Sequence, residues 1–402
     1  MKKPFLFTIM LGILTLFTSC DDNDMVEDSS EQRSITIENV IAVKDFVQSG
    51  TFQGTGTPPV ILPGQTVSFN FNAAKGQSLM FTTMYGASKD WFFAPENPGL
   101  KLYQDNGMPI TGDVSSSIKL WDNGSKNDGT GTAENNPIMM VPGVNASTLM
   151  KLILSYNEAK SEFTLAITNT SGGTANETPF SPGVWAISNV LGGSLINSTP
   201  FYKAGSITNA EITAVAETGN NAPLAAKVIN KTGIITGLSP VLIVVYRGDT
   251  NPIFQIGAKD MGKGLKELAQ MGDVSKLKSS LEGMQGIRGV YVAGNGPIAP
   301  GTKVEMNIAV GSEDKIAYAT MFGYSNDWFY ANESTITSDM KGDLTSKTDL
   351  FDNGTGVDQY PGAGNKQVLF NGVPDPENKN IEKVGSQVPI PSVSSVLKII
   401  YQ

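Results

Sequence analysis

The stretch Thr83–Ala94, TMYGASKDWFFA, occurs a second time in the chain as Thr320–Ala331, TMFGYSNDWFYA. Eight of the twelve positions are identical, and the same offset of 237 residues aligns Pro63-Gly64 with Pro300-Gly301. Self-similarity at a fixed offset is the sequence signature of a structural unit that is encoded twice. Each feature predicted from one copy can therefore be checked against the other.

A second motif follows the first in both copies. Leu120–Ser125, LWDNGS, matches Leu350–Thr355, LFDNGT, at an offset of 230 residues. The copies also end alike, in Ser147–Ile153 and Ser394–Ile400. Because separate motifs recur in the same order, the repeat covers a whole folding unit and not a single loop.

Local patterns in both copies are typical of β-strands. Val67–Asn72 and Phe163–Thr168 alternate apolar and polar residues, a period of two that suits strands with one buried face. We expect Phe163–Thr168 to open the second copy as Ile35–Val40 opens the first. Short strands between turns rich in Gly, Pro, Asn and Asp predict a mainly β fold with two tandem antiparallel β-sandwich domains, at 34–158 and 162–402.

The second copy carries an additional segment, about 200–285, with helical patterns. Within it Pro252-Ile253-Phe254 echoes Pro200-Phe201-Tyr202. Two pairs of short helices are predicted in this segment: Thr208–Thr218 with Ala222–Lys231, and Gly264–Met271 with Val274–Leu281. We expect this helical insertion to form a packing layer on the second sandwich and not an active site.

Composition excludes several kinds of chemistry. The 402 residues include no histidine and one cysteine, so a Ser-His-Asp triad, a Cys-His pair, a thiolate zinc site and an intrachain disulfide are all excluded. There are 29 Lys and Arg residues against 38 Asp and Glu, a formal net charge of −9. This balance argues against nucleic acid as a partner, because nucleic-acid modules concentrate basic residues.

The N-terminus has the order of an export signal. Lys2 and Lys3 precede an apolar stretch that ends just before Thr18-Ser19-Cys20. Leu16–Cys20 resembles a bacterial lipobox, which predicts a signal peptide at 1–19 and a lipid anchor on Cys20. The alternative is a plain signal peptide that contains a cysteine. Residues 20–33 are predicted to form an acidic tether, and we expect an outer-membrane lipoprotein that is exposed on the cell surface.

The pair of repeated motifs resembles a known family. Ser-x-Asp-Trp-Phe followed by Leu-Trp-Asp-x-Gly-Ser/Thr is similar to the spondin N-terminal domain, found in F-spondin, mindin and many bacterial secreted proteins. Ser181–Trp185 also resembles the start of bacterial copies. The resemblance implies a β-sandwich that binds calcium near its loop end and mediates adhesion or ligand binding without catalysis.

The resemblance also implies which residues hold the metal. The family's aspartate before Trp-Phe falls on Asp90 and Asp327, and its second aspartate falls on Asp122 and Asp352. The sequence departs from the family pattern where Asn123 and Asn353 replace alanine, and where Lys126 and Gly356 replace an acid.

The residues themselves allow two interpretations of these loops. Calcium takes six to eight oxygen ligands, which loops rich in Asp, Asn and Gly can supply. Asp128 and Asp358 each follow the second aspartate by six residues and are predicted to replace the missing acid. The alternative is a tight hairpin turn, since Asn-Gly favours type I′ geometry.

Four further residues are candidates for binding a partner: Trp91, Asn123, Trp328 and Asn353. Tryptophan at an exposed loop tip acts as a binding anchor, but tryptophan in a β-sandwich is more often part of the core. For Trp91, Trp121 and Trp328 we therefore favour the core.

Three functions are consistent with these features. The leading hypothesis is a lipid-anchored binding or adhesion protein that is not an enzyme, with calcium as cofactor and an extracellular protein or glycan as partner. The alternatives are a glycan-active enzyme with paired carboxylates, such as Asp90 with Asp122, and a structural spacer at the cell surface.

Overall fold

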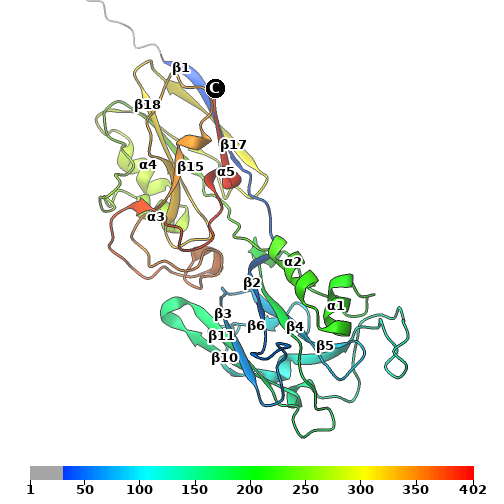
Figure 1. Ribbon diagram of the computed structural model, residues 1–402. Helices are drawn as coiled ribbons and strands as arrows, with labels where there is room; N and C mark the ends of the chain where they lie inside the picture. Colours follow the sequence, from blue (N-terminus) through cyan, green and yellow to red (C-terminus); the bar gives the residue numbers. More distant parts are fainter. Residues whose placement is uncertain (1–29) are drawn as a thin grey trace, which may run out of the picture.

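The computed structural model describes residues 30–402, so the predicted signal peptide and Cys20 lie outside the described residues. The chain is mainly β and forms two sandwiches of antiparallel sheets, as the repeat predicted (Figure 1). No helix within residues 30–402 is long and apolar enough to cross a membrane.

The first sandwich consists of a larger and a smaller sheet. The larger sheet has the order β2 (Phe46–Phe52), β12 (Gly183–Ser188), β4 (Ser78–Met84), β5 (Trp91–Pro95), β8 (Ile118–Asp122), β9 (Met139–Met140), and β6 (Leu100–Lys101) pairs with β4. The smaller sheet has the order β3 (Thr66–Asn72), β11 (Glu162–Asn169), β10 (Met150–Asn157), β7 (Gly112–Asp113). Alternating side chains fill the space between the sheets, and Phe163, Leu165 and Ile167 of β11 are fully buried there.

The second sandwich has the same arrangement. Its larger sheet has the order β16 (Ile287–Ala293), β15 (Val241–Tyr246), β18 (Lys315–Met321), β19 (Trp328–Asn332), β22 (Thr348–Asp352), β23 (Glu382–Lys383), and β20 (Ile336–Thr337) pairs with β18. Its smaller sheet has the order β17 (Lys303–Val310), β1 (Glu31–Asn39), β24 (Leu397–Tyr401), β21 (Gly342–Asp343). A short hairpin, β13 (Val190–Leu191) with β14 (Ser194–Leu195), leads out of the first sandwich and packs against the core of the second.

The strand order corrects the predicted boundary between the copies. β1 pairs with β17 and β24 and so belongs to the second sandwich, whereas β11 pairs with β3 and β10 and belongs to the first. The first sandwich is thus a circular permutation of the second and is inserted between β1 and β15. The predicted divisions 34–158 and 162–402 are wrong for these two strands. Residues 31–33, which were assigned to the tether, also lie in β1.

The reason is that an alternating pattern specifies which face of a strand is buried but not which sheet it joins. β1 and β11 have equivalent patterns, with Ile35 and Ile37 buried in one and Phe163 and Leu165 in the other. β11 forms a hairpin with β10 because a short turn, with Ser161 at φ 49°, joins them directly. This local pairing leaves the place beside β24 to β1.

Each sandwich carries one of the two predicted helical pairs. α1 (Ala210–Thr218) and α2 (Ala222–Asn230) pack on the first sandwich, and α3 (Leu265–Met271) and α4 (Ser275–Leu281) on the second (Figure 1). A short helix, α5 (Val393–Val396), precedes β24. The helices form where the sequence predicted them, but the assignment of the whole 200–285 segment to the second sandwich is wrong. The similar segments Pro200–Tyr202 and Pro252–Phe254 each precede one helical pair, the first on the first sandwich and the second on the second sandwich.

Aromatic contacts show that the two helical pairs occupy equivalent places. The ring of Tyr202 meets Phe92 edge-on with the centroids 5.4 Å apart, and Phe254 meets Phe329 in the same way at 5.3 Å. Phe92 and Phe329 are themselves equivalent in the repeat. The helical layers therefore bury the outer faces of the larger sheets, in agreement with the predicted packing role.

Candidate metal centre

Strand pairing brings the two repeated motifs together in the second sandwich. Trp328, the first residue of β19, lies opposite Asp352, the last residue of β22. Asp327 immediately precedes Trp328, so both motif aspartates lie at the same end of the sheet. The loop after β22 then folds back over them.

The carboxylate of Asp327 is fully buried, and only one of its oxygens is satisfied. Oδ2 accepts hydrogen bonds from the backbone N–H of Thr355 at 2.6 Å, the Thr355 hydroxyl at 2.9 Å and the backbone N–H of Gly356 at 2.8 Å. Oδ1 is buried and has no hydrogen-bond partner within residues 30–402. A buried carboxylate oxygen without a donor is energetically unfavourable, and a bound cation is one way to satisfy it.

Three carboxylates converge at this point. One oxygen from each of Asp327, Asp352 and Asp358 lies within 4.8 Å of the others, and in the described part of the chain this is the one such group of three acids. The indole N–H of Trp328 donates to Asp358 Oδ1 at 2.7 Å and thereby fixes its position. Asp352 Oδ1 accepts the backbone N–H of Gly354 at 2.7 Å.

The crowding of these acids raises their pKa values. Burial, followed by the negative charge of Asp352, raises the pKa of Asp327 to about 7. The residue Asp358 is exposed, but protein atoms surround its carboxyl group. This burial and the charges of Asp352 and Asp327 raise the pKa of Asp358 to about 7. The pKa of Asp352 is raised as well, by burial and by the charge of Glu377. The charge of Lys379 opposes the rise at Asp352 in part. The remaining shifts mark a site where negative charges are held close together.

Sequence reasoning did not identify Glu377 as part of this centre. Its Oε1 pairs with Lys379 Nζ at 2.7 Å, while Oε2 is buried without a partner among the described residues. The backbone N–H of Glu377 donates to the carbonyl of Thr355, as that of Glu134 does to Ser125 in the first sandwich. Glu377 and Glu134 are therefore structurally equivalent, although loops of different length separate them from their motifs and hide the match.

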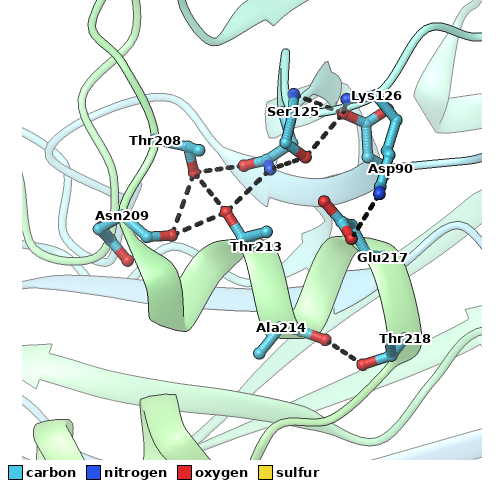
Figure 2. Close-up of polar contacts among 10 residues, drawn as sticks. Asp90, Ser125, Lys126, Thr208, Asn209, Thr213, Ala214, Glu217 and Thr218 are labelled. Carbon is cyan, nitrogen blue, oxygen red and sulfur yellow. Dashed lines mark hydrogen bonds and ion pairs between the residues drawn. The ribbon is translucent and has the colours of Figure 1, made fainter. Parts of the chain in front are cut away.

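The first sandwich builds the same framework around Asp90 (Figure 2). Asp90 Oδ2 accepts the backbone N–H and hydroxyl of Ser125 at 2.8 and 3.1 Å and the backbone N–H of Lys126 at 2.8 Å. Asp122 Oδ1 accepts the N–H of Gly124 at 2.8 Å. Asp90 Oδ1 also has no partner in the described residues, as in the second sandwich.

The surroundings of Asp90 nevertheless differ from those of Asp327. Asp128, which is exposed as Asp358 is, does not join Asp90 and Asp122 in a group as close as the second one, as judged over residues 30–402. The equivalent glutamate is also satisfied, because Asn127 and Asn136 donate to the two oxygens of Glu134, each at 2.8 Å. Burial and the charges of Asp90, Asp128 and Glu134 still raise the pKa of Asp122.

A lysine enters the loop of the first sandwich. The Nζ of Lys126 lies 3.5 Å from Glu217 Oε2 on α1 (Figure 2). In the second sandwich the residue equivalent to Lys126 is Gly356. A Cβ added to Gly356 would lie 3.1 Å from Pro374 Cβ and 3.4 Å from Gln270 Nε2. The second site is therefore packed without a basic side chain at this position.

The structure tests the turn interpretation of Asp-Asn-Gly. Gly124 and Gly354 have positive φ angles of 70° and 67°. Within residues 30–402 the only non-glycine residues with positive φ are Ser161 and Asn371, so Asn123 and Asn353 have negative φ. A type I′ turn, which needs positive φ at both central residues, is therefore absent from both described loops. The other part of the turn interpretation, that the aspartate accepts a local backbone hydrogen bond, is confirmed, because both aspartates form Asx turns with the glycine N–H groups.

The four additional binding candidates do not lie on exposed tips. Trp328 is 4% exposed and Asn123 and Asn353 are fully buried, while Trp91 is half-buried. Trp121 is also in the core, as favoured from the sequence. The hydroxyl of Thr208 donates to Asn123 Oδ1, which fastens the loop to the start of α1. Asn353 Nδ2 instead donates to Asp260 at 3.1 Å, and its Oδ1 is unpartnered among the described residues. The burial of Trp328 agrees with the core placement favoured from the sequence, and Asn123 and Asn353 shape the loops from inside.

The chain matches no protein-family model, and no curated protein matches it. The chemistry of the site must therefore be argued from its own residues.

Proposed function

We propose that the second sandwich binds a calcium ion at Asp327, Asp352 and Asp358, and that the protein is a non-catalytic binding protein of the cell envelope. The observation that carries the metal part is the buried, unpartnered Oδ1 of Asp327 at the centre of three converging carboxylates, among the described residues. When bound, calcium supplies positive charge against these carboxylates.

The donor set favours calcium over other common metal ions. All the available ligands are oxygens, and the chain has no histidine and no cysteine near the site. Zinc and copper prefer nitrogen and sulfur, whereas calcium accepts carboxylates, amide oxygens and water in flexible geometry. Glu377 supplies a further acid on the same loop, and its charge is felt at Asp352 and Asp358.

The protein residues around the ion are arranged to hold it and not to react. Asp327 is fixed by three hydrogen bonds, Asp352 by its Asx turn and Asp358 by Trp328. A general acid or base must instead exchange protons with a substrate that can reach it. The side chains therefore support a rigid recognition loop better than a glycan-active enzyme. Reducing ends released from a polysaccharide panel would contradict this choice.

Thermal unfolding tests the metal part. At a calcium concentration one hundred times the dissociation constant, binding to the folded state stabilises it by about 2.7 kcal/mol relative to the chelated protein. The midpoint should rise in the wild type and stay constant in the variant with Asp327→Ala plus Asp352→Ala. A wild-type midpoint that is unchanged at millimolar calcium would contradict the proposal.

The anchor and the partner remain part of the proposal because the lipobox resemblance and the spondin resemblance support them. Cys20→Ala should release the protein from the membrane fraction if the cysteine is lipidated. A glycan array and a pull-down with extracellular proteins should show a calcium-dependent ligand. The absence of any ligand in both experiments would favour a structural spacer.

A further inference from the structure

The loop that follows the acidic site connects the two sandwiches. We call residues 359–367, which begin immediately after Asp358, the docking segment. Ala363 of this segment is fully buried in the core of the first sandwich, and Tyr360 packs against the cores of both sandwiches. A piece of the second sandwich thus completes the interior of the first.

Polar contacts hold the docking segment to the first sandwich. The side-chain amide of Gln77 donates to the carbonyl of Gly362 at 2.8 Å. The hydroxyl of Ser161, in the turn between β10 and β11, donates to Asn365 Oδ1 at 3.1 Å. Gln77 and Ser161 are both buried, so these bonds form in places from which water is excluded.

The same segment is tied to the acidic site at its other side. The backbone N–H of Gln359 donates to Asn326 Oδ1 at 3.0 Å, and Asn326 directly precedes Asp327. The N–H of Gly362 donates to the carbonyl of Tyr324 at 2.9 Å. The hydroxyl of Tyr324 in turn donates to the carbonyl of Val190 at 2.7 Å, in the hairpin that leads from the first sandwich. The position of Asp358 and the position of the docking segment are therefore linked mechanically.

The equivalent loop of the first sandwich makes no such connection in the described structure. Asp128 is followed by a turn that closes on itself, since the N–H of Gly131 donates to the carbonyl of Asn127 at 2.7 Å. Residues 132–137 are exposed. The docking role is specific to the second copy, which is also the copy in which the three carboxylates converge.

Electrostatics suggests what the link does. Three carboxylates held within 4.8 Å repel one another when no cation is present. Asp352 ends β22 and Asp327 directly precedes β19, whereas Asp358 is exposed, lies on the loop and is held to the sheet by one hydrogen bond from Trp328. Outward movement of Asp358, with loss of that bond, therefore relieves the repulsion most easily. That movement would pull on Gln359 and on the buried residues beyond it.

We propose that the acidic site controls the docking of the two sandwiches. With a divalent cation bound, Asp358 stays beside Asp327 and Asp352 and the docking segment stays in the first sandwich; without the cation the segment undocks and the sandwiches move independently. This inference rests on the proposed calcium site. Because coupling is reciprocal, loss of docking must also weaken cation binding.

The test measures the distance between the sandwiches directly. Cys20→Ser removes the native cysteine from the full-length protein. Spin labels are then attached to two new cysteines, Lys151→Cys on β10 and Lys398→Cys on β24, which are exposed positions on different sandwiches. Double electron–electron resonance should show one narrow distribution of distances between the two labels in calcium and a broader distribution in chelator. Calorimetry on the same sample reports calcium binding separately. If calcium binds but the distance distributions in calcium and in chelator are identical, the coupling between the site and docking is overturned while the calcium site stands. If no calcium binds, the proposed function is overturned.

A matched pair of variants tests reciprocity. Ala363→Glu places a charge in the core of the first sandwich and should broaden the distribution even in calcium and weaken calcium binding by about 5-fold or more. The added negative charge itself would strengthen binding, so weakening must come from undocking. Ala133→Glu, in the exposed loop of the first copy, should change neither quantity.

A milder variant protects the test against misfolding. Asn365→Ala removes the two hydrogen bonds that Asn365 Oδ1 accepts, from Ser161 of the first sandwich and from Gln359 within the docking segment. It should shift both quantities in the same direction as Ala363→Glu, by less. If both docking variants broaden the distance distribution but keep wild-type calcium affinity, the proposal is overturned.

Discussion

The loops around Asp90 and Asp327 share a framework but differ in charge. In both, a buried aspartate receives three hydrogen bonds from the two residues after Asp-Asn-Gly, and in both its second oxygen is unpartnered among the described residues. Only the second loop brings a third carboxylate within 4.8 Å of the first two, over residues 30–402. The first loop contains a lysine instead. The motif therefore specifies the shape of the loop, and the residues after it decide whether the loop attracts a cation.

The largest expected effect comes from removing the buried charge of Asp327 in the second loop. Asp327→Asn keeps an oxygen to accept the three hydrogen bonds but removes a charge from the carboxylate group. We expect at least ~100-fold weaker calcium binding, about 2.7 kcal/mol, since changes to residues that only support ligands already cost 10–100-fold. Calorimetry measures the change.

The control is the same substitution in the first loop. Asp90→Asn should leave calcium affinity as in the wild type. If Asp90→Asn weakens binding as much as Asp327→Asn does, the two loops are functionally alike and the contrast between them is wrong.

The second prediction concerns pH. Because the pKa values of Asp327 and Asp358 are raised to about 7, protons compete with calcium for these carboxylates below that pH. With one proton displaced per ion from a group of pKa about 7, affinity should fall about 50-fold between pH 7 and pH 5. Titration calorimetry in buffers of different ionisation enthalpy also counts the protons released. A constant affinity across this range would show that the acids do not bind the ion.

Stability without calcium should depend on pH in the opposite way. A carboxyl whose pKa is higher in the folded state than in the unfolded chain contributes stability that is complete below about pH 4. This contribution is lost as pH rises through the folded value of about 7. The chelated protein should therefore lose stability between pH 4 and pH 7 in denaturant titrations. In Asp327→Asn this loss should shrink.

The smallest effect is expected at Lys126. The ion pair with Glu217 is partly exposed, with side chains 31% and 22% accessible, and its distance is 3.5 Å. Lys126→Ala should lower the free energy of unfolding by about 0.5 kcal/mol, measured in denaturant. It should not create a second calcium site, because the substitution does not bring Asp128 into a close group with Asp90 and Asp122. A second calcium ion bound by this variant would show that the lysine alone blocks the first loop.

Much of this architecture could be predicted from the sequence, and the exceptions have physical reasons. The repeat, the alternating strands, the short helices and the convergence of Asp327 with Asp352 follow from local patterns and from strand pairing. The sheet to which β1 belongs could not be predicted, because its alternation fits either sandwich. The sandwich on which α1 and α2 pack could not be predicted either, because a helical pattern specifies which face is buried but not against which sheet it packs.

The site was predicted in part for a similar reason. The equal spacing of Asp128 and Asp358 suggested equal roles, but spacing along a loop does not determine where its side chains point. Both aspartates are exposed, but the indole N–H of Trp328 donates to Asp358, whereas the indole N–H of Trp91 has no hydrogen-bond partner among the described residues. Glu377 and the docking segment were missed because both lie in the loop after Asp352, where the copies differ most in length.

The number of calcium ions bound per chain tests the central contrast most directly. Titration of the chelated wild-type protein near pH 8 should give one ion per chain, and that ion should be lost in Asp327→Asn and kept in Asp90→Asn. No bound ion, or two bound ions with one retained in each variant, would contradict the account.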